Sequence, residues 1–212
     1  MYHVDIITPC SRPHFLVEIS ESINKVFRGN YFWHIVLDSS VNISLIPSIN
    51  RSLEKNISSY SFYINSDRGN VGHGHRNFLL KKLYANHVDV AGLNRWIYFI
   101  DDDNILHPEL KNHLQEFEKE SPAIIVNQCY KDGNLRYSDG EPRVLMTACK
   151  ENMKVFFVDT AQAFFNLKYI KNCYWEKEAY NADGKFITRL FQSHKNFNFI
   201  DKNLSYYNYL TS

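Results

Sequence analysis

Short apolar runs are separated by polar segments and turn residues along the chain. Residues 4–8, 33–37 and 96–100 are runs of five residues rich in β-branched and aromatic side chains, as buried strands are. Residues 60–65 alternate in the manner of a half-buried strand. Further strand candidates are residues 123–127, 155–158 and 197–200.

Helical spacing lies between these runs. Residues 16–27 carry apolar positions three or four apart, and Arg28-Gly29-Asn30 ends that helix. Residues 76–84 and 183–192 have helical patterns, and Pro108 suits the first turn of a helix whose apolar stripe is Leu110, Leu114 and Phe117.

Two segments read as loops. Residues 69–75 are rich in Gly, and residues 131–142 are polar, so the second is a loop or an irregular hairpin. Strands and helices alternate over about the first 120 residues. This order predicts an α/β fold in which a mostly parallel central sheet carries helices on both faces, formed as a single domain over residues 1–212.

Composition limits the function classes. The 212 residues are 44% hydrophobic and 15% aromatic, enough for one sizeable core. Lys and Arg number 24 against 23 Asp and Glu, without a basic stripe, so a nucleic-acid partner is not expected.

The cysteines and apolar runs suggest the compartment. The four cysteines are scattered outside CxxC spacing, which fits a reducing compartment and no zinc site. Neither a signal peptide nor a transmembrane run of ~20 apolar residues is present. We expect a cytoplasmic protein and leave peripheral attachment to a membrane open.

The most informative segment is Asp101-Asp102-Asp103-Asn104, directly after an apolar strand. Three adjacent carboxylates repel one another, and a divalent cation removes that cost. Mn²⁺ and Mg²⁺ prefer carboxylate oxygens and often share their shell with phosphate. Ligands of open α/β sheets bind at the carboxyl ends of strands, where this triplet is expected. The structural alternative is a solvated acidic turn or a helix cap.

The block WIYFIDDDNILHPEL resembles the aspartate-rich metal motif of GT-A glycosyltransferases. It is similar to the bacterial family 2 inverting transferases and to the animal glucuronyltransferases of the glycosaminoglycan linker. The second group also resembles this chain at Thr8-Pro9, Arg12-Pro13, Asp38, Arg68-Gly69, Arg76-Asn77 and Val158-Asp159-Thr160-Ala161.

This resemblance implies a Rossmann-like GT-A fold, with residues 1–104 binding the nucleotide sugar and residues 105–212 binding the acceptor. It implies that Asp103, with Asp101, holds Mn²⁺ or Mg²⁺. The predicted nucleotide-sugar site is Thr8, Pro9, Arg12, Asp38, Arg76, Asp101 and Asp102, and the predicted acceptor site is Asp159 and Gln162.

Several of these residues have plain structural alternatives. Asp38 can be a turn or cap, and Arg76 can form a surface ion pair. His73 and His75 alternate in a way that suggests a metal site, but without nearby acids they are interpreted as loop residues. The glycines around them would allow close approach to the donor.

The C-terminal third departs from the glucuronyltransferases because no histidine follows His194. Asn181-Ala182-Asp183-Gly184 instead resembles the helix start of family 2 enzymes, where the acid is the general base. Asp183 is therefore the expected base, with a helix N-cap as its structural role. Glu176 and Glu178 are the rival bases.

Together these features predict an inverting, metal-dependent transfer of sugar from a nucleoside diphosphate sugar to a glycan hydroxyl, with UDP as the default nucleotide. Two other functions remain open. A sugar nucleotidyltransferase has a similar plan, but residues 8–13 lack its usual Gly-rich basic loop. A non-catalytic calcium-dependent sugar-binding module could also use the triplet.

Overall fold

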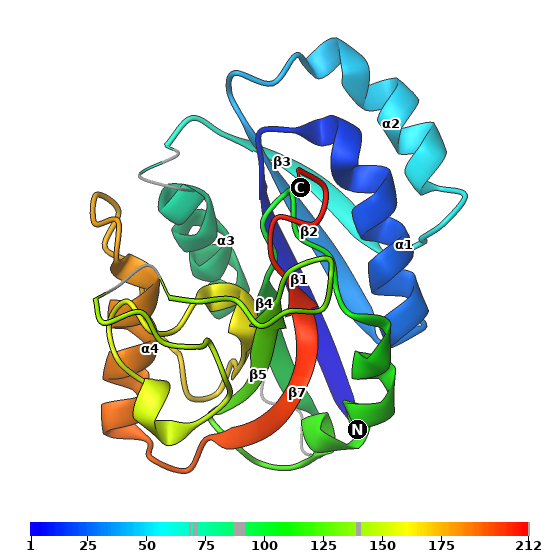
Figure 1. Ribbon diagram of the computed structural model, residues 1–212. Coiled ribbons are helices and arrows are strands. Elements are labelled where there is room, and N and C mark those ends of the chain that lie inside the picture. Colours follow the sequence, from blue (N-terminus) through cyan, green and yellow to red (C-terminus); the bar gives the residue numbers. More distant parts are fainter. Residues whose placement is uncertain (68, 70–71, 87–91, 139–140, 212) are drawn as a thin grey trace.

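The computed structural model describes residues 1–211 except 68, 70–71, 87–91 and 139–140. A seven-stranded sheet runs through its centre in the order β3-β2-β1-β4-β6-β5-β7 (Figure 1). Only β6 runs antiparallel to its neighbours among these described strands. The strands are β1 (Tyr2–Cys10), β2 (Tyr31–Asp38), β3 (Tyr60–Asn65), β4 (Asn94–Phe99), β5 (Ala123–Cys129), β6 (Ala163–Asn166) and β7 (Asn198–Tyr206).

Helices cover both faces of this sheet, as the sequence pattern predicted. On one face α1 (Leu16–Phe27) packs against α2 (Ile46–Leu53) and the 3-10 helix η4 (Pro108–Glu118). On the other lie α3 (His73–Ala85) and α4 (Ala182–Ser193), at the left of Figure 1. The predicted α/β fold with a mostly parallel sheet and a single domain is confirmed. The remaining short helices are η1 (Pro13–Phe15), η2 (Ile43–Leu45), η5 (Lys150–Asn152) and η6 (Thr160–Gln162).

The strands divide the core into two layers because side chains alternate across a sheet. In β1, Val4 and Ile6 join the layer under α1, whereas Ile7 joins the layer under α3 and α4. The helices supply matching stripes, such as Ile19 and Ile23 of α1. α1 ends at Phe27, and its C-cap residue Arg28 has a left-handed φ of 47° and is followed by Gly29. This agrees with the predicted stop.

Three predicted elements are corrected. Residues 155–158 are not a strand, because Phe156 has a left-handed φ of 71° that breaks extended backbone, and β6 begins later at Ala163. The segment containing His73 and His75 is not a loop but the first turn of α3. Finally, the helix that begins at Pro108 is present, but it is a 3-10 helix, with Leu110 and Phe117 buried.

The polar segment 131–142 forms an irregular hairpin in its described part, with isolated bridges from Leu135 to Cys129 and from Tyr137 to Leu145. Arg68, Asn70 and Val71, which belong to the predicted Gly-rich segment and its family resemblance, lie outside the described residues. No helix in the described part of the chain has the length and apolarity needed to cross a membrane.

The topology determines where a ligand can bind. The chain proceeds from β1 outward to β2 and β3, then returns to place β4 on the other side of β1. Such a reversal leaves a crevice at the carboxyl ends of the two central strands. These ends are Cys10 of β1 and Phe99 of β4, and the aspartate triplet begins two residues after Phe99, at Asp101.

Candidate active site

A cavity of about 280 Å³ opens at this crevice. Its walls come from the ends of β1 and β4, the first turns of α3 and α4, the long connection between β5 and β6, and the C-terminal segment. Six carboxylates line it against three guanidinium groups. The charged lining residues are Arg12, Asp38, Arg76, Asp101, Asp102, Asp103, Arg136, Asp159 and Asp183.

The turn after β4 holds the triplet in place. The backbone N–H of Asn104 donates to the carbonyl of Asp101 at 3.1 Å. The C-terminal segment then fixes this turn, since the Asn104 side chain accepts from the backbone N–H of Asn208 at 2.7 Å, and Leu210 N–H donates to the Asp103 carbonyl at 3.0 Å. The last residues of the chain therefore form one wall of the cavity, with Asn208 among its lining residues.

Arg12 pairs with two members of the triplet. Asp102 accepts from Arg12 Nε at 2.9 Å and from Arg12 Nη2, and also from the backbone N–H groups of Ser11 at 2.6 Å and Arg12 at 2.7 Å. Asp103 Oδ2 lies 2.9 Å from Arg12 Nη2. Both Asp102 oxygens are thus engaged by the turn after β1, so this residue orders Ser11 and Arg12.

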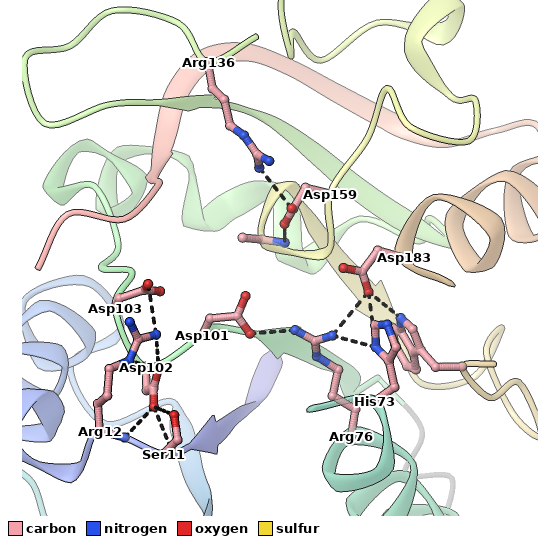
Figure 2. Close-up of polar contacts among 12 residues, drawn as sticks. Ser11, Arg12, His73, Arg76, Asp101, Asp102, Asp103, Arg136, Asp159 and Asp183 are labelled. Atoms are coloured by element: carbon pink, nitrogen blue, oxygen red, sulfur yellow. Dashed lines mark hydrogen bonds and ion pairs between the residues drawn. The ribbon is translucent and has the colours of Figure 1, made fainter. Parts of the chain in front are cut away.

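Arg76 joins the two sides of the cavity. From α3, its Nη2 donates to Asp101 Oδ1 at 2.6 Å, and its Nη1 lies 3.3 Å from Asp183 Oδ1 at the start of α4. Asp183 also accepts from the indole Nε1 of Trp175 at 2.8 Å. Figure 2 shows the guanidinium between these two carboxylates, with His73 beside it. The predicted alternative of a surface ion pair is wrong for Arg76, which is 1% exposed.

The carboxylates are incompletely compensated. Burial raises the pKa of Asp183 to about 6, against the lowering effect of Arg76, and the nearby Asp159 and Asp101 raise it further. Burial likewise raises the pKa values of Asp101 and Asp103, and neighbouring carboxylates add to the shift. A carboxyl group with a pKa near 6 is suited to take a proton at neutral pH.

A third arginine, Arg136, forms a further ion pair in the lining of the cavity. Arg136 Nη1 donates to Asp159 Oδ2 at 3.0 Å and to Gln128 Oε1 at 2.7 Å, and its guanidinium lies 3.6 Å from the centre of the Tyr207 ring. Figure 2 shows this pair opposite Asp101. Sequence reasoning missed Arg136 and Tyr207, because neither lies in a motif and their contacts join segments far apart in the chain.

Most of the predicted site residues line the cavity, including Pro9 and Asp38, but Thr8 and Gln162 do not. Thr8 is fully buried on the opposite side of β1 from Pro9, where its hydroxyl accepts from Trp33 Nε1 at 2.8 Å. The buried Gln162 amide donates to the carbonyls of Val126 at 3.2 Å and Met146 at 2.9 Å. Both predictions are therefore corrected to structural roles.

The structure also distinguishes the alternatives for the residues near the start of α4, namely a cap or a cavity role for Asp183 and the rival bases Glu176 and Glu178. Asp183 is not the N-cap, because Asn181 occupies that position and the Asp183 carboxylate points to Arg76 and Trp175. Glu176 and Glu178 are exposed and do not line the cavity. Glu176 Oε2 instead pairs with Lys185 Nζ at 2.7 Å. Among the three proposed bases, only Asp183 lies in the cavity.

Two exposed aromatic side chains lie at the cavity beside α4. Tyr180 is 66% exposed and precedes the helix, and Phe156 is 48% exposed. The Phe156 backbone packs against Gly184, where an added Cβ would lie 2.9 Å from Phe156 N. A bulky residue rarely adopts the left-handed φ of Phe156. This conformation places a large apolar ring at a polar cavity.

Asp101 and Asp103 supply too few oxygens to hold a hard cation alone, so a bound ligand would have to complete its coordination shell. Among the described residues, no three His, Cys, Asp or Glu side chains group as a metal site. Asp101 and Asp103 each engage one carboxylate oxygen with arginine, and the other oxygen has the chemistry to bind Mn²⁺ or Mg²⁺. Two such ligands agree with a cation whose shell is completed by phosphate and water.

No protein-family model and no curated protein matches the sequence. The structure, however, is similar to solved structures of proteins in complex with nucleotides and nucleotide sugars. Residues 1–349 of S. aureus TarS in complex with UDP-GlcNAc superpose with a TM-score of 0.69 at 14% identity, over 97% of this chain and 58% of that one. The same TarS segment with UDP gives 0.70 at 14% identity, covering 97% and 60%.

A second protein has the same architecture. The mannosyltransferase PcManGT from Pyrobaculum calidifontis, in complex with GDP-Man and Mn²⁺, gives a TM-score of 0.65 at 11% identity over 97% of this chain and 56% of that chain. The chain thus spans less than two thirds of these proteins. The comparison shows that the chain shares the α/β fold of these proteins, with a mostly parallel central sheet as predicted, and it does not separate the two families that the sequence resembles.

Proposed function

We propose that this protein transfers a sugar from a nucleoside diphosphate sugar to a hydroxyl of a glycan, with inversion at the anomeric carbon. The observation that carries this proposal is the arrangement around Arg76. One buried guanidinium lies between a carboxylate of the acidic triplet and a separate carboxylate of raised pKa, at the switch point of a glycosyltransferase fold. These are the parts that a displacement of diphosphate by a hydroxyl requires.

The donor occupies the side formed by β1, β4 and α3. Pro9 and Asp38 line the end where the nucleoside lies, and Arg76 and Arg12 face the diphosphate. Because carboxylates outnumber guanidinium groups in the cavity, an anionic diphosphate needs a further cation. Asp103 and Asp101 would hold Mn²⁺ or Mg²⁺, which supplies positive charge for the leaving diphosphate. Arg76 adds a donor that is already oriented by its carboxylate partners.

The acceptor occupies the side formed by α4 and the β5–β6 connection. Asp183 accepts the proton of the attacking hydroxyl, while Trp175 Nε1 and Arg76 hold its carboxylate in place. Attack from the side of Asp183, with the diphosphate leaving toward Asp103, inverts the anomeric configuration. Asp159 lies in the same wall and offers an acceptor for a second hydroxyl.

The lining also favours a carbohydrate as the acceptor. The exposed rings of Phe156 and Tyr180 provide apolar surface for the face of a sugar ring, beside carboxylates that accept hydrogen bonds from hydroxyl groups. The same carboxylates repel an anionic acceptor group. A neutral glycan combines the two properties that this wall requires.

UDP is the nucleotide we propose, as the sequence resemblance implies. One structural neighbour is a complex with UDP-GlcNAc and another a complex with GDP-Man, so both nucleotides belong in the first donor screen. The purified protein is incubated with each donor, Mn²⁺ and a panel of neutral glycosides, and the released nucleotide is identified by chromatography.

The product separates the possible functions. Transfer releases a nucleoside diphosphate and forms a glycoside of inverted configuration, which NMR spectroscopy of the new linkage establishes. A sugar nucleotidyltransferase would instead consume or release pyrophosphate. A calcium-dependent sugar-binding module would bind free sugar with Ca²⁺ and leave every donor intact. A glycoside that retains the donor configuration would overturn the assignment of Asp183 as base.

A further inference from the structure

His73 is a buried histidine that does not itself line the cavity but whose imidazole contacts Arg76, which does. It is the first residue of α3, one helical turn before Arg76, and it is 0% exposed. Its Nδ1 lies 2.9 Å from Arg76 Nη1. A guanidinium can only donate, so Nδ1 accepts this hydrogen bond and the ring proton of neutral His73 is on Nε2.

The hydrogen bond from Arg76 restricts a guanidinium that has two competing partners. Arg76 Nη2 is held firmly by Asp101 at 2.6 Å, whereas Nη1 reaches Asp183 over 3.3 Å. The contact with His73 is the shorter of the two that Nη1 makes. Without it, Arg76 could turn about its bond to Asp101 or pair fully with Asp183. Figure 2 shows His73 and Asp183 on the same side of the guanidinium.

We propose that His73 is a positioning residue, which holds the Arg76 guanidinium at a fixed point between Asp101 and Asp183. This proposal rests on the proposed function, since it assigns a task to His73 within the same site. Asp183 Oδ1 and His73 Nδ1 are 3.8 Å apart, so the histidine does not act on the base directly. It acts through Arg76, and so fixes the position of the guanidinium relative to Asp101 on the diphosphate side and to Asp183 on the base side.

The surroundings of His73 keep its imidazole neutral, so that Nδ1 can accept the hydrogen bond from Arg76. Burial and the positive charge of Arg76 lower the pKa of His73 to about 3. It remains neutral at every pH where the protein would work, and Nδ1 remains an acceptor. A protonated imidazole would face the guanidinium with a like charge and could not accept.

Two amide substitutions test the role of Nδ1. In His73→Asn the amide oxygen can lie near the place of Nδ1, whereas in His73→Gln it reaches toward the place of Nε2. We expect His73→Asn to keep turnover within a few-fold of wild type. His73→Gln and His73→Leu should lose roughly 10- to 100-fold, the range for a misplaced site group. Thermal unfolding of each variant shows whether the fold is retained.

A double-mutant cycle with Arg76→Ala shows whether His73 acts through the arginine. UDP affinity with Mn²⁺ is measured by calorimetry beside turnover. If the proposal is right, His73→Leu weakens both in the wild-type background and changes neither in the Arg76→Ala background. Equal losses in both backgrounds, or equal losses for Asn, Gln and Leu, would assign His73 to packing alone and overturn the proposal.

The same measurements separate this inference from the proposed function. If UDP does not bind, or if Arg76→Ala binds UDP as wild type does, the proposed donor site itself is wrong. If Arg76→Ala loses affinity and turnover while folded His73→Leu retains both, the donor site stands and the role of His73 is refuted.

Discussion

Asp5 is a buried carboxylate and Asp183 a half-buried one, each with an arginine and a histidine nearby, but they differ in how fully those partners compensate their charge. Asp5, in β1, accepts from Arg95 Nε at 2.6 Å and Nη2 at 3.2 Å, and its Oδ1 lies 2.9 Å from His34 Nε2. Both Asp5 oxygens are therefore engaged by Arg95. Despite burial, which by itself raises the value, these contacts lower the pKa of Asp5.

Asp183 shares its arginine. Arg76 makes its shortest contact with Asp101 at 2.6 Å and a second with His73 at 2.9 Å. It leaves Asp183 a single guanidinium contact at 3.3 Å. With burial and neighbouring carboxylates added, the pKa of Asp183 is raised to about 6. The Asp183 side chain is 20% exposed, and that of Asp5 is 1% exposed.

The difference between the two sites separates stability from chemistry. A fully paired carboxylate such as Asp5 fastens β1 to β2 and β4, and has nothing to offer a substrate. A carboxylate that is only partly compensated at a cavity can take a proton. Such a group destabilises the folded protein when it is ionised, and carboxylates of raised pKa are found mainly at functional sites. Residue type alone does not distinguish the two. Their partners and their access to the cavity do.

The largest contrast is expected in turnover. Asp183→Asn retains an oxygen that can accept from Trp175 Nε1 but cannot take a proton, so transfer should fall by roughly 100- to 10,000-fold while UDP binding persists. Asp5→Asn, outside the cavity, should keep the turnover of its folded fraction. Steady-state kinetics with active-site titration measure both. Near wild-type turnover in Asp183→Asn would remove it as the base.

For the free energy of unfolding, we expect the larger effect at Asp5 and the smaller one at Asp183. Asp5→Ala leaves Arg95 and His34 without their buried carboxylate, and we expect a loss of about 3 kcal/mol in the free energy of unfolding. Asp183→Ala should cost less, because it also removes a carboxylate that repels Asp101 and Asp159. Urea unfolding at pH 7 gives both values. A larger loss for Asp183→Ala than for Asp5→Ala would show that Asp183 is a structural ion pair.

The pH dependence should have opposite signs at the two carboxylates. The pKa of Asp183 lies above its unfolded value, so its ionisation lowers stability as pH rises from about 4 to 6, while kcat/KM rises tenfold per unit up to about pH 6. The pKa of Asp5 is lowered, so its stabilising effect is present at neutral pH and is lost as pH falls below about 4.

A mutation tests whether Asp183 causes the rise of kcat/KM between about pH 4 and 6, the acidic limb of the pH profile. The charged groups facing Asp183 are Arg76 of α3, Asp101 after β4 and Asp159 before η6, while His73 stays neutral. Arg76→Ala removes the positive charge that lowers the pKa of Asp183. The acidic limb of kcat/KM, measured on the residual activity of this variant, should therefore move to higher pH. A limb that stays in place in this variant would mean that another group titrates.

Much of the fold follows from local patterns. The apolar runs that became β1, β2 and β4 are long enough and sufficiently apolar to be buried, and the order of strands and helices restricts the topology to a mostly parallel sheet. Short elements were missed or misplaced. The polar α2 and the four-residue β6 carry too little periodicity, and β6 is fixed by pairing with β4 and β5, which are distant in sequence.

The residues of the candidate site could be predicted where they belong to one short motif. The triplet and the start of α4 placed Asp101, Asp103 and Asp183 at the cavity. Alternation along β1 could have corrected Thr8, since it shares a side with Ile6 and not with Pro9. Arg136, Tyr207 and Asn208 could not have been found this way, because only the folded chain brings their segments to the triplet.

The central claim is that the acidic triplet and Arg76 form a nucleoside diphosphate site that works with a divalent cation. Calorimetric titration of UDP into the protein, with Mn²⁺ and with excess chelator, tests it directly, and Asp103→Ala and Arg76→Ala serve as the variants. We expect binding with Mn²⁺, its loss in chelator and in Asp103→Ala, and a weakening of about 1–3 kcal/mol in Arg76→Ala. Equal UDP affinity with Mn²⁺ and in chelator, unchanged in both variants, would contradict it.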